Sequence, residues 1–342
     1  MSRRVASGRQ PTIFLVLLPA LLLGLAGCPP PESWRSALYP EGWEPGYQDS
    51  QGRFLHDFSY AGYHDGASLP DSPPGSTYDV LDFGADSSGA SDATAAIQAA
   101  IQAASAAGGG VVFLPAGLYR CDGVLTVTNS GVVIRGEGPA ATRIFFTLAS
   151  GMSDKAHITF RGSLQQGSDL LLSEDGENQS FTVSLNDASG LGVGDEVSLG
   201  WVITDEFIAE HGMTGTWLAF NGQWKPFFRR EVAALDLSGS PDQVRLNIPL
   251  RYPAKLRDQA SLRKESGYLR EGGIEKLAVA NAVAWDDAWN EMRVHLIDFI
   301  NTRDCWLREV HTFATPFEPG SGYHLQNGGI KILSSKRVTV TD

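Results

Sequence analysis

The chain has 342 residues, of which 42% are hydrophobic and 19% charged, and it contains 38 Gly and 18 Pro. This composition is typical of a folded, turn-rich domain and excludes a disordered chain or a coiled coil. The formal net charge of −12 argues against a nucleic-acid partner, because nucleic acids bind basic surfaces. Residues 225–270 are the exception, with 10 basic and 5 acidic side chains. This basic segment is either a set of solvated ion pairs or a local attractor for an acidic ligand.

Residues 1–27 have the features of an export signal. Three arginines precede an apolar run at 13–25, which is shorter than the ~20 residues of a membrane-spanning helix. The tetrapeptide Leu-Ala-Gly-Cys that ends at Cys28 resembles the lipobox of bacterial lipoproteins. This resemblance implies cleavage before Cys28, lipidation of that residue, and a protein anchored by lipid in the bacterial cell envelope, at the outer membrane or cell surface. An ordinary cleaved signal or a short anchor is the alternative.

Residues 28–76 combine Pro, Gly and Ser with many aromatic side chains. A plain linker is poor in aromatic residues, so we expect a short tether followed by an irregular arm that packs on the folded domain. The two remaining cysteines, Cys121 and Cys305, could pair in an exported protein. Because nothing in the sequence brings them together, we expect two buried free thiols instead.

Residues 77–163 predict a short strand, one helix and then several short strands. Ser91 and Asp92 offer an N-cap for a helix over 93–107, whose apolar stripe is Ile97, Ile101 and Ala104. Three glycines end this helix at 108–110. Strands are expected at 111–114, 124–128 and 132–135, separated by Gly- and Pro-containing turns.

Residues 263–342 show a β-rich repeat. Ile274, Trp306 and Val338 are each 32 positions apart and begin similar phrases. A period near 30 that is built of β phrases predicts stacked coils. The last phrase stops at the end of the chain, so we expect either further coils beyond it or a partner that covers the open end. Between the two repetitive parts, residues 164–262 break the rhythm and are interpreted as an inserted β-rich subdomain.

Three segments together carry a resemblance to a known family. They are Asp-Phe-Gly-Ala-Asp at 82–86, the Ala-rich segment at 91–101, and the Gly-Gly-Gly-Val-Val-Phe-Leu-Pro-Ala-Gly-Leu-Tyr run at 108–119. This opening resembles that of the pectate lyase superfamily, in its rhamnogalacturonase and epimerase branch. The resemblance implies an all-β fold, a single-stranded right-handed parallel β-helix whose N-terminal end is capped by the helix. It also implies action on a polysaccharide, although the motif lies at the cap and holds no catalytic residue.

The first candidate site lies in the predicted insertion. If 205–211 is helical, Glu206 and Glu210 share one face. Sugar faces stack on aromatic rings, and arginine pairs with uronate carboxylates. The alternative is that the aromatic residues pack the insertion and the acids pair with the arginines. The candidates are Asp205, Glu206, Glu210 and His211 for catalysis, and Trp201, Trp217, Trp224, Arg229 and Arg230 for substrate binding.

The second candidate site is a loop between two β phrases, where solenoid proteins often bind ligands. Asp286, Asp287 and His295 are its catalytic candidates, and Trp285 and Trp289 are its substrate-binding candidates. The adjacent aspartates could bind Ca²⁺ or act as a carboxylate pair, or the loop could be a solvated turn. No residue is assigned to a resident metal. The other histidines, including His64, are interpreted as structural.

Three functions fit these observations. The first is a polysaccharide lyase or glycoside hydrolase that acts in a β-helix groove, with the insertion as one wall. The second is a non-catalytic glycan-binding or adhesion lipoprotein, and the third is a structural lipoprotein whose insertion binds a protein. The spaced catalytic motifs of the polygalacturonase relatives are not found in this sequence, so the reaction type stays open. No oligomeric state is predicted.

Overall fold

The computed structural model describes residues 35–316 and 322–342. The described residues divide into two units, with the boundary between Leu55 and His56. The described part of the first unit consists of turns, in which Asp49 accepts hydrogen bonds from the main chain and side chain of Arg53. The predicted export signal at 1–27 and the predicted lipidation site, Cys28, lie outside the described residues. None of the described helices is long and apolar enough to cross a membrane.

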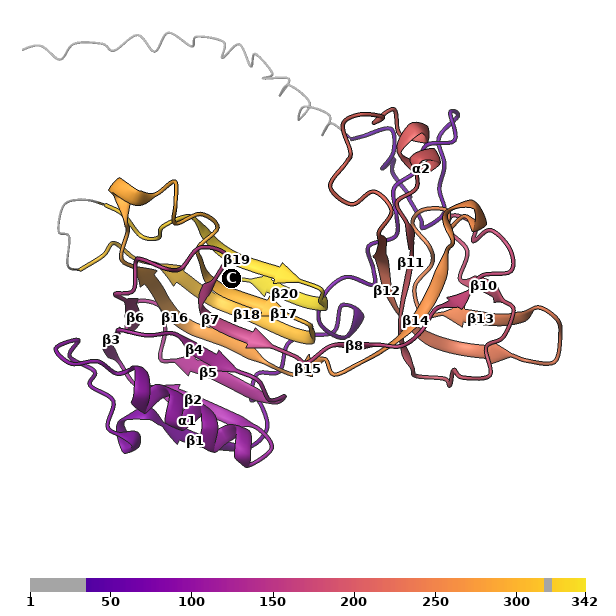
Figure 1. Cartoon of the computed structure of the whole chain (residues 1–342). Helices are drawn as coiled ribbons and strands as arrows, with labels where there is room; N and C mark the ends of the chain where they lie inside the picture. The colour runs from indigo at the N-terminus through magenta and orange to yellow at the C-terminus, as the bar shows by residue number, and fades with distance from the viewer. Residues whose placement is uncertain (1–34, 317–321) are drawn as a thin grey trace, which may run out of the picture. The chain divides into compact units, whose positions relative to one another are not determined.

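Two parallel sheets form the wall of a β-helix in the second unit (Figure 1). The first sheet contains, in spatial order, β1 (Ser76–Asp79), β2 (Gly110–Leu114), β5 (Val132–Gly136), β16 (Gly273–Asn281), β18 (Thr302–Thr312) and β20 (Lys336–Thr341). Joined to it are β3 (Gly117–Cys121), β6 (Thr142–Phe146) and β15 (Leu269–Arg270). The second sheet contains β4 (Leu125–Val127), β7 (Ala156–Arg161), β17 (His295–Ile300) and β19 (Gly328–Leu333). The predicted right-handed parallel β-helix is confirmed.

The coils that follow the insertion repeat every 33 residues, one more than the spacing expected from the sequence. Ile274 pairs in register with Leu307, which in turn pairs with Val340. The 32-residue spacing aligns Trp306 with Ile274, but the side chain of Trp306 packs on Tyr63 and Val133 in a separate small cluster, whereas Ile274 and Leu307 face the main core. Because neighbouring residues of a strand point to opposite faces, a one-residue error exchanges inward and outward side chains.

The core of the β-helix is a stack of apolar side chains inside the coils. Phe160 and Phe299 illustrate it, with stacked rings whose centroids are 4.9 Å apart. The helix α1 (Thr94–Ala106) packs against this core through Ile97, Ala100, Ile101 and Ala104, which include the predicted stripe. Cys121 and Cys305 are buried free thiols, as the sequence predicts. Burial raises the pKa of each thiol to about 12, so both behave as small apolar side chains.

A single-residue left-handed turn recurs in successive coils of the first sheet. Glu271, Asp304 and Arg337 are 33 positions apart and adopt left-handed backbone conformations with φ of 54°, 51° and 53°. The residue before each left-handed residue pairs with the corresponding residue of the next coil. Arg270 pairs with Arg303, and Arg303 pairs with Lys336. The turn therefore stacks two acidic side chains and one basic side chain at neighbouring levels of the helix.

An antiparallel sheet with its own core occupies residues 165–266 (Figure 1). Its strands, in spatial order, are β10 (Thr182–Leu185), β13 (Asp242–Leu246), β12 (Trp224–Asp236), β11 (Glu196–Val202), β14 (Ser261–Ser266) and β8 (Gln165–Gln166), and β9 (Leu170–Leu171) also pairs with β14. Short helices in the unit are α2 (Asp205–Glu210), η1 (Tyr63–Asp65), η2 (Val80–Phe83), η3 (Leu256–Asp258) and η4 (Trp285–Asp287). We call the part of the chain from 165 to 266 the insertion.

Candidate anion-binding cleft

Basic side chains line a cleft between β12 of the insertion and the turn that joins β19 to β20. The cleft has a volume of about 610 Å³, and a neighbouring hollow of about 180 Å³ shares four of its residues. The four shared residues are Arg229, Arg230, Arg251 and Lys336, and Arg337 lines the smaller hollow as well. We call the two together the anion cleft. None of the described residues that line either hollow is acidic, so the wall of the anion cleft carries positive charge.

Arg230 is buried in the cleft wall and binds main-chain oxygens. Its side chain is held by 3.0 Å hydrogen bonds that it donates to the carbonyl oxygens of Ile248, Pro249 and Arg229. No carboxylate forms an ion pair with it within the described ranges. Burial, with the nearby charge of Arg251, lowers the pKa of Arg230 to about 10. Since a buried unpaired cation is costly, an anion entering the cleft gains a strong interaction here.

Arg251 is the second cation of the cleft without an ion-pair partner among the described residues. Its Nη2 atom donates a 2.8 Å hydrogen bond to the carbonyl oxygen of Asp57, and its guanidinium carbon lies 5.2 Å from the ring centroid of Phe58. In the portion of the chain that the structure describes, no carboxylate lies within ion-pair distance of it. These contacts orient the guanidinium without neutralising its charge.

The positive charges of Arg229 and Lys336 are partly compensated by carboxylates. Arg229 forms an ion pair with Glu265 and donates a 3.0 Å hydrogen bond to the hydroxyl of Tyr268. Lys336 forms an ion pair with Glu196 and donates a 3.2 Å hydrogen bond to the carbonyl oxygen of Arg230. Burial, reinforced by the charges of Arg337 and Arg303, lowers the pKa of Lys336 to about 7. Its charge therefore changes near neutral pH.

The predicted tryptophans of the insertion lie outside the cleft. Trp201 is buried and stacks on Phe227, with centroids 3.9 Å apart, so its faces belong to the core of the insertion. Trp224 is covered by Arg263, whose guanidinium carbon lies 3.7 Å from the ring centroid, and donates a hydrogen bond to Ser261. Trp217 is 39% exposed and lines a separate apolar pocket.

The catalytic candidates around α2 are engaged in local contacts. Glu210 forms ion pairs with Lys255 and Arg257, and these two hydrogen-bonded cations lower the pKa of Glu210 to about 2. The Nδ1 atom of His211 is hydrogen-bonded to the carbonyl oxygen of Phe207, and its Nε2 atom is hydrogen-bonded to the hydroxyl of Tyr252. Asp205 accepts a hydrogen bond from Asn221, and Glu206 is exposed. These residues do not line the anion cleft.

The second predicted cluster is an exposed loop around η4. Trp285 and Trp289 are 65% and 88% exposed, and the ring of Trp285 stacks on Tyr323. Asp287 accepts a hydrogen bond from Asn290, and Asp286 is exposed. His295 begins β17, where burial lowers its pKa. The structure brings neither aspartate into a group of three potential metal ligands among the described residues.

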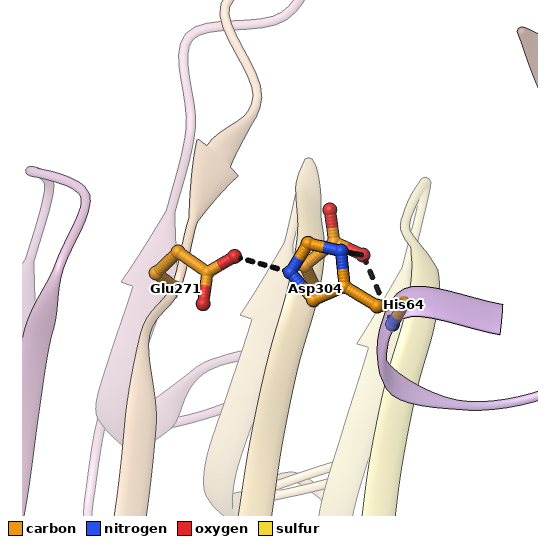
Figure 2. Close-up of side chains that lie close together, drawn as sticks. All are labelled: His64, Glu271 and Asp304. Carbon is orange, nitrogen blue, oxygen red and sulfur yellow. Dashed lines mark hydrogen bonds and ion pairs between the residues drawn. The ribbon is translucent and has the colours of Figure 1, made fainter. Parts of the chain in front are cut away.

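One group of three potential metal ligands does occur within the described ranges, at the left-handed turns (Figure 2). His64 of η1 reaches Glu271 with Nε2 at 2.7 Å, and its Nδ1 lies 3.7 Å from Asp304. Glu271 also accepts a 2.5 Å hydrogen bond from the hydroxyl of Tyr63. The sequence alone predicts a structural role for His64. The 33-residue spacing of Glu271 and Asp304 was the available signal for this group.

Arg337 already forms an ion pair with Asp304, one of the three potential ligands. Its Nε atom lies 2.7 Å from one carboxylate oxygen of Asp304, and its Nη2 atom donates a 2.9 Å hydrogen bond to the other. A cation bound to Asp304 would have to compete with this guanidinium. As arranged, the carboxylates of Glu271 and Asp304 hold the imidazole of His64 and fix residues 63–65 on the β-helix, next to the smaller hollow that Arg337 lines.

Comparison with known proteins gives a family match that includes the start of the β-helix. Residues 77–189 match the family model described as rhamnogalacturonase A/epimerase, pectate lyase-like. Mannuronan C5-epimerase AlgE3 of Azotobacter vinelandii is 57% identical over 74 residues, 20% of this chain and 4% of that protein. Alginate lyase 7 of the same organism is 47% identical over 85 residues, 23% of this chain and 10% of that protein. The match thus spans a small part of each relative.

Solved structures match over more of the chain at lower similarity. The Gp54 tailspike of Acinetobacter baumannii bacteriophage AP22, solved with a capsular saccharide, has 12% identity and a TM-score of 0.44, over 75% of this chain and 36% of that one. The A-module of mannuronan C-5 epimerase AlgE6 of Azotobacter vinelandii has 17% identity and a TM-score of 0.32, over 75% and 43%.

Proposed function

We propose that this protein is carbohydrate-active and binds an acidic polysaccharide in the anion cleft. The match of residues 77–189 to the pectate lyase-like family model supports the first part of this proposal. The observation that carries the proposal is the pair Arg230 and Arg251, two cations of one cleft with no ion-pair partner in the described residues. A uronate carboxylate supplies the missing charge, and guanidinium groups bind carboxylates with short, directed hydrogen bonds.

The charge distribution supports an acidic ligand at this place. The chain as a whole carries a net charge of −12, whereas residues 225–270, which contribute Arg229, Arg230 and Arg251, carry an excess of 5 basic side chains. A polyanion is repelled by most of such a surface and attracted at the cleft, which focuses binding. Mannuronan and alginate, the polymers in the names of the relatives, are built of uronic acids.

The cleft favours proton abstraction over glycoside hydrolysis. Hydrolysis needs two carboxyl groups that flank the scissile bond, and none of the described residues lining the cleft is acidic. Abstraction of the proton next to a uronate carboxylate needs a base that is neutral near pH 7 and cations that stabilise the developing charge. The guanidinium groups of Arg230 and Arg251 supply the cations, and Lys336, whose pKa burial lowers to about 7, is the candidate base of the cleft.

Binding without chemistry is the second candidate, since Lys336 also forms an ion pair with Glu196. One experiment separates the cases. Purified protein is mixed with polymannuronate, and with dextran as a neutral control. We expect binding of polymannuronate that weakens as salt is added, and none of dextran; equal binding of both polymers contradicts the proposal. Ultraviolet absorbance of an unsaturated product then identifies elimination. Incorporation of solvent deuterium into the sugar without that absorbance identifies epimerisation. Binding with neither signal identifies a binding protein without catalytic activity.

We also propose that the protein is exported and anchored by lipid at Cys28. The support is the short apolar segment at 13–25 and the lipobox-like tetrapeptide that ends at Cys28. Cell fractionation of the Cys28→Ser variant tests this. Release of the variant from the membrane fraction is expected, and a variant that stays with the membranes contradicts the proposal.

A further inference from the structure

An apolar pocket lies beside the anion cleft and plays no part in the proposed polysaccharide binding. Its volume is about 680 Å³, within the range of small-molecule sites. Aromatic and aliphatic side chains form nearly all of its wall, including Phe207, Trp217, Phe220 and Phe227. So apolar a wall suits an alkyl chain better than a sugar, whose hydroxyl groups would lose hydrogen bonds to water there.

The pocket is open to solvent. Leu218 and Phe220 at its rim are 68% and 57% exposed, and Trp217 and Phe227 are 39% and 40% exposed. Soluble proteins seldom expose several large apolar side chains together unless something binds to them. The contacts of Trp201 with Phe207 and Phe227 tie the floor of the pocket to the core of the insertion, so the pocket is built into the fold.

The pocket and the anion cleft are contiguous. Pro226, Phe227 and Phe228 of β12 line both, and Arg229 and Arg230 follow directly on the cleft side. Arg230 lies over the ring of Phe228, with its guanidinium carbon 4.9 Å from the centroid. Lys225 is the lysine of the pocket wall and lies over Phe220, 4.2 Å from the ring centroid. Cations therefore border the apolar surface along one strand.

We propose that this pocket binds the alkyl chain of a single-chain anionic amphiphile, whose head group lies in the anion cleft. The alkyl chain buries apolar surface against Trp217, Phe220 and Phe227, which is favourable in proportion to the area removed from water. The head group pairs with Arg251, a cation without an ion-pair partner in the described residues. This inference goes beyond the proposed function, because it needs no polysaccharide.

Dodecanoate, used as a monomer in solution, is the probe for this site. Calorimetric titration of the wild-type protein compares dodecanoate with acetate, which has the head group alone, and with dodecanol, which has the chain alone. We expect dodecanoate to bind at least tenfold more tightly than either. Equal affinity for dodecanoate and acetate removes the role of the pocket, and equal affinity for dodecanoate and dodecanol removes the role of the cleft; either result overturns the proposal.

Variants at the exposed rim test the location without disturbing the core. Leu218→Asp and Phe220→Asp place a charge at the mouth of the pocket, and we expect each to weaken dodecanoate binding at least tenfold. Val193→Asp is the matched control, because Val193 is 69% exposed in the insertion but does not line the pocket. Wild-type affinity in both rim variants, with unchanged circular dichroism, overturns the proposal.

Two further measurements separate this site from its alternatives. Sedimentation with phosphatidylglycerol vesicles tests membrane docking, and a protein that binds vesicles but not dodecanoate overturns the proposal. Polymannuronate binding is measured on the same Leu218→Asp sample. Loss of dodecanoate binding with retained polymannuronate binding supports the pocket independently of the polysaccharide proposal. A wild-type protein that binds dodecanoate but not polymannuronate supports the pocket and contradicts only the polysaccharide proposal.

Discussion

The ammonium group of Lys336 donates a hydrogen bond to the main-chain oxygen of Arg230, 3.2 Å away, and so joins β20 of the β-helix to β12 of the insertion. Glu196 of β11 reinforces the junction, because it forms ion pairs with both Lys336 and Arg303. The two walls of the anion cleft are thereby held together by buried polar contacts. Removal of one charged residue from a buried network of this kind destabilises the fold, because it leaves another buried charge without a partner.

The first prediction concerns the pH dependence of polyanion binding. The pKa of Lys336 is lowered to about 7, so in the free protein its side chain is charged below pH 7 and neutral above it. A bound anion favours the charged form, so affinity falls as the pH rises through 7, and binding above pH 7 takes up a proton. Calorimetry in buffers of different ionisation enthalpy detects this proton. Lys336→Met abolishes the uptake, and an unchanged uptake in that variant contradicts the assignment.

The second prediction concerns stability as a function of pH. The pKa of Lys336 is about 7 in the folded protein, against 10.5 for an unperturbed lysine. Between these values the unfolded chain binds more protons, so the contribution of Lys336 makes the free energy of unfolding rise with pH in this window. Denaturant unfolding at pH 7 and pH 10 measures the rise. The rise in the wild type is expected to exceed that in Lys336→Met, where Glu196 keeps its ion pair with Arg303.

The third prediction tests the close packing where the insertion leaves the β-helix. A Cβ atom at Gly162 would lie 2.3 Å from the carbonyl oxygen of Asn301 and 2.5 Å from the amide nitrogen of Leu269. Gly162→Ala therefore forces main-chain movement and lowers the free energy of unfolding by about 1–3 kcal/mol. At Gly190 an added Cβ meets no atom within 4 Å, so Gly190→Ala is the control. Equal stability of the two variants in urea unfolding would refute the packing at this junction.

The fourth prediction concerns the aromatic stack inside the coils. Phe299 is fully buried and stacks on Phe160. Phe299→Ala removes this contact and leaves a cavity, so we expect it to lower the free energy of unfolding by about 3–5 kcal/mol. Phe58→Ala is a useful comparison, because Phe58 is 60% exposed. Similar losses in both variants would show that the stack is not the stabilising element.

The sequence predicted the β-helix because its signals are local and repeated. Ile97 and Ile101 mark one face of a helix, and the glycine and proline turns divide the following strands. The repeat was misaligned by one residue, since Trp306 is as apolar as the inward residues although it packs on Tyr63 outside the coil. Hydrophobicity alone cannot say which face of a strand a large side chain occupies.

The candidate site was predictable only in part. The sequence predicts Arg229 and Arg230 as substrate-binding residues of the insertion, and the structure places both in the anion cleft. Lys336 lies more than a hundred positions away, and only the stacking of coils brings it beside them. His64 meets Glu271 and Asp304 for the same reason, because left-handed turns in successive coils align the two acids (Figure 2). Contacts of this kind follow from the exact repeat length, which short β phrases leave uncertain by one residue.

The most direct test of the central claim is calorimetric titration of mannuronate oligomers into three proteins: the wild type, Arg251→Gln and Arg245→Gln. Arg245 is an exposed arginine of the same basic segment that lies over Phe181, outside the cleft. Loss of one charge-assisted hydrogen bond costs about 1.5–3 kcal/mol, so Arg251→Gln is expected to bind about tenfold or more weakly. Arg245→Gln is expected to bind as the wild type does. Equal affinity in all three proteins, each folded by circular dichroism, would contradict the assignment of the cleft.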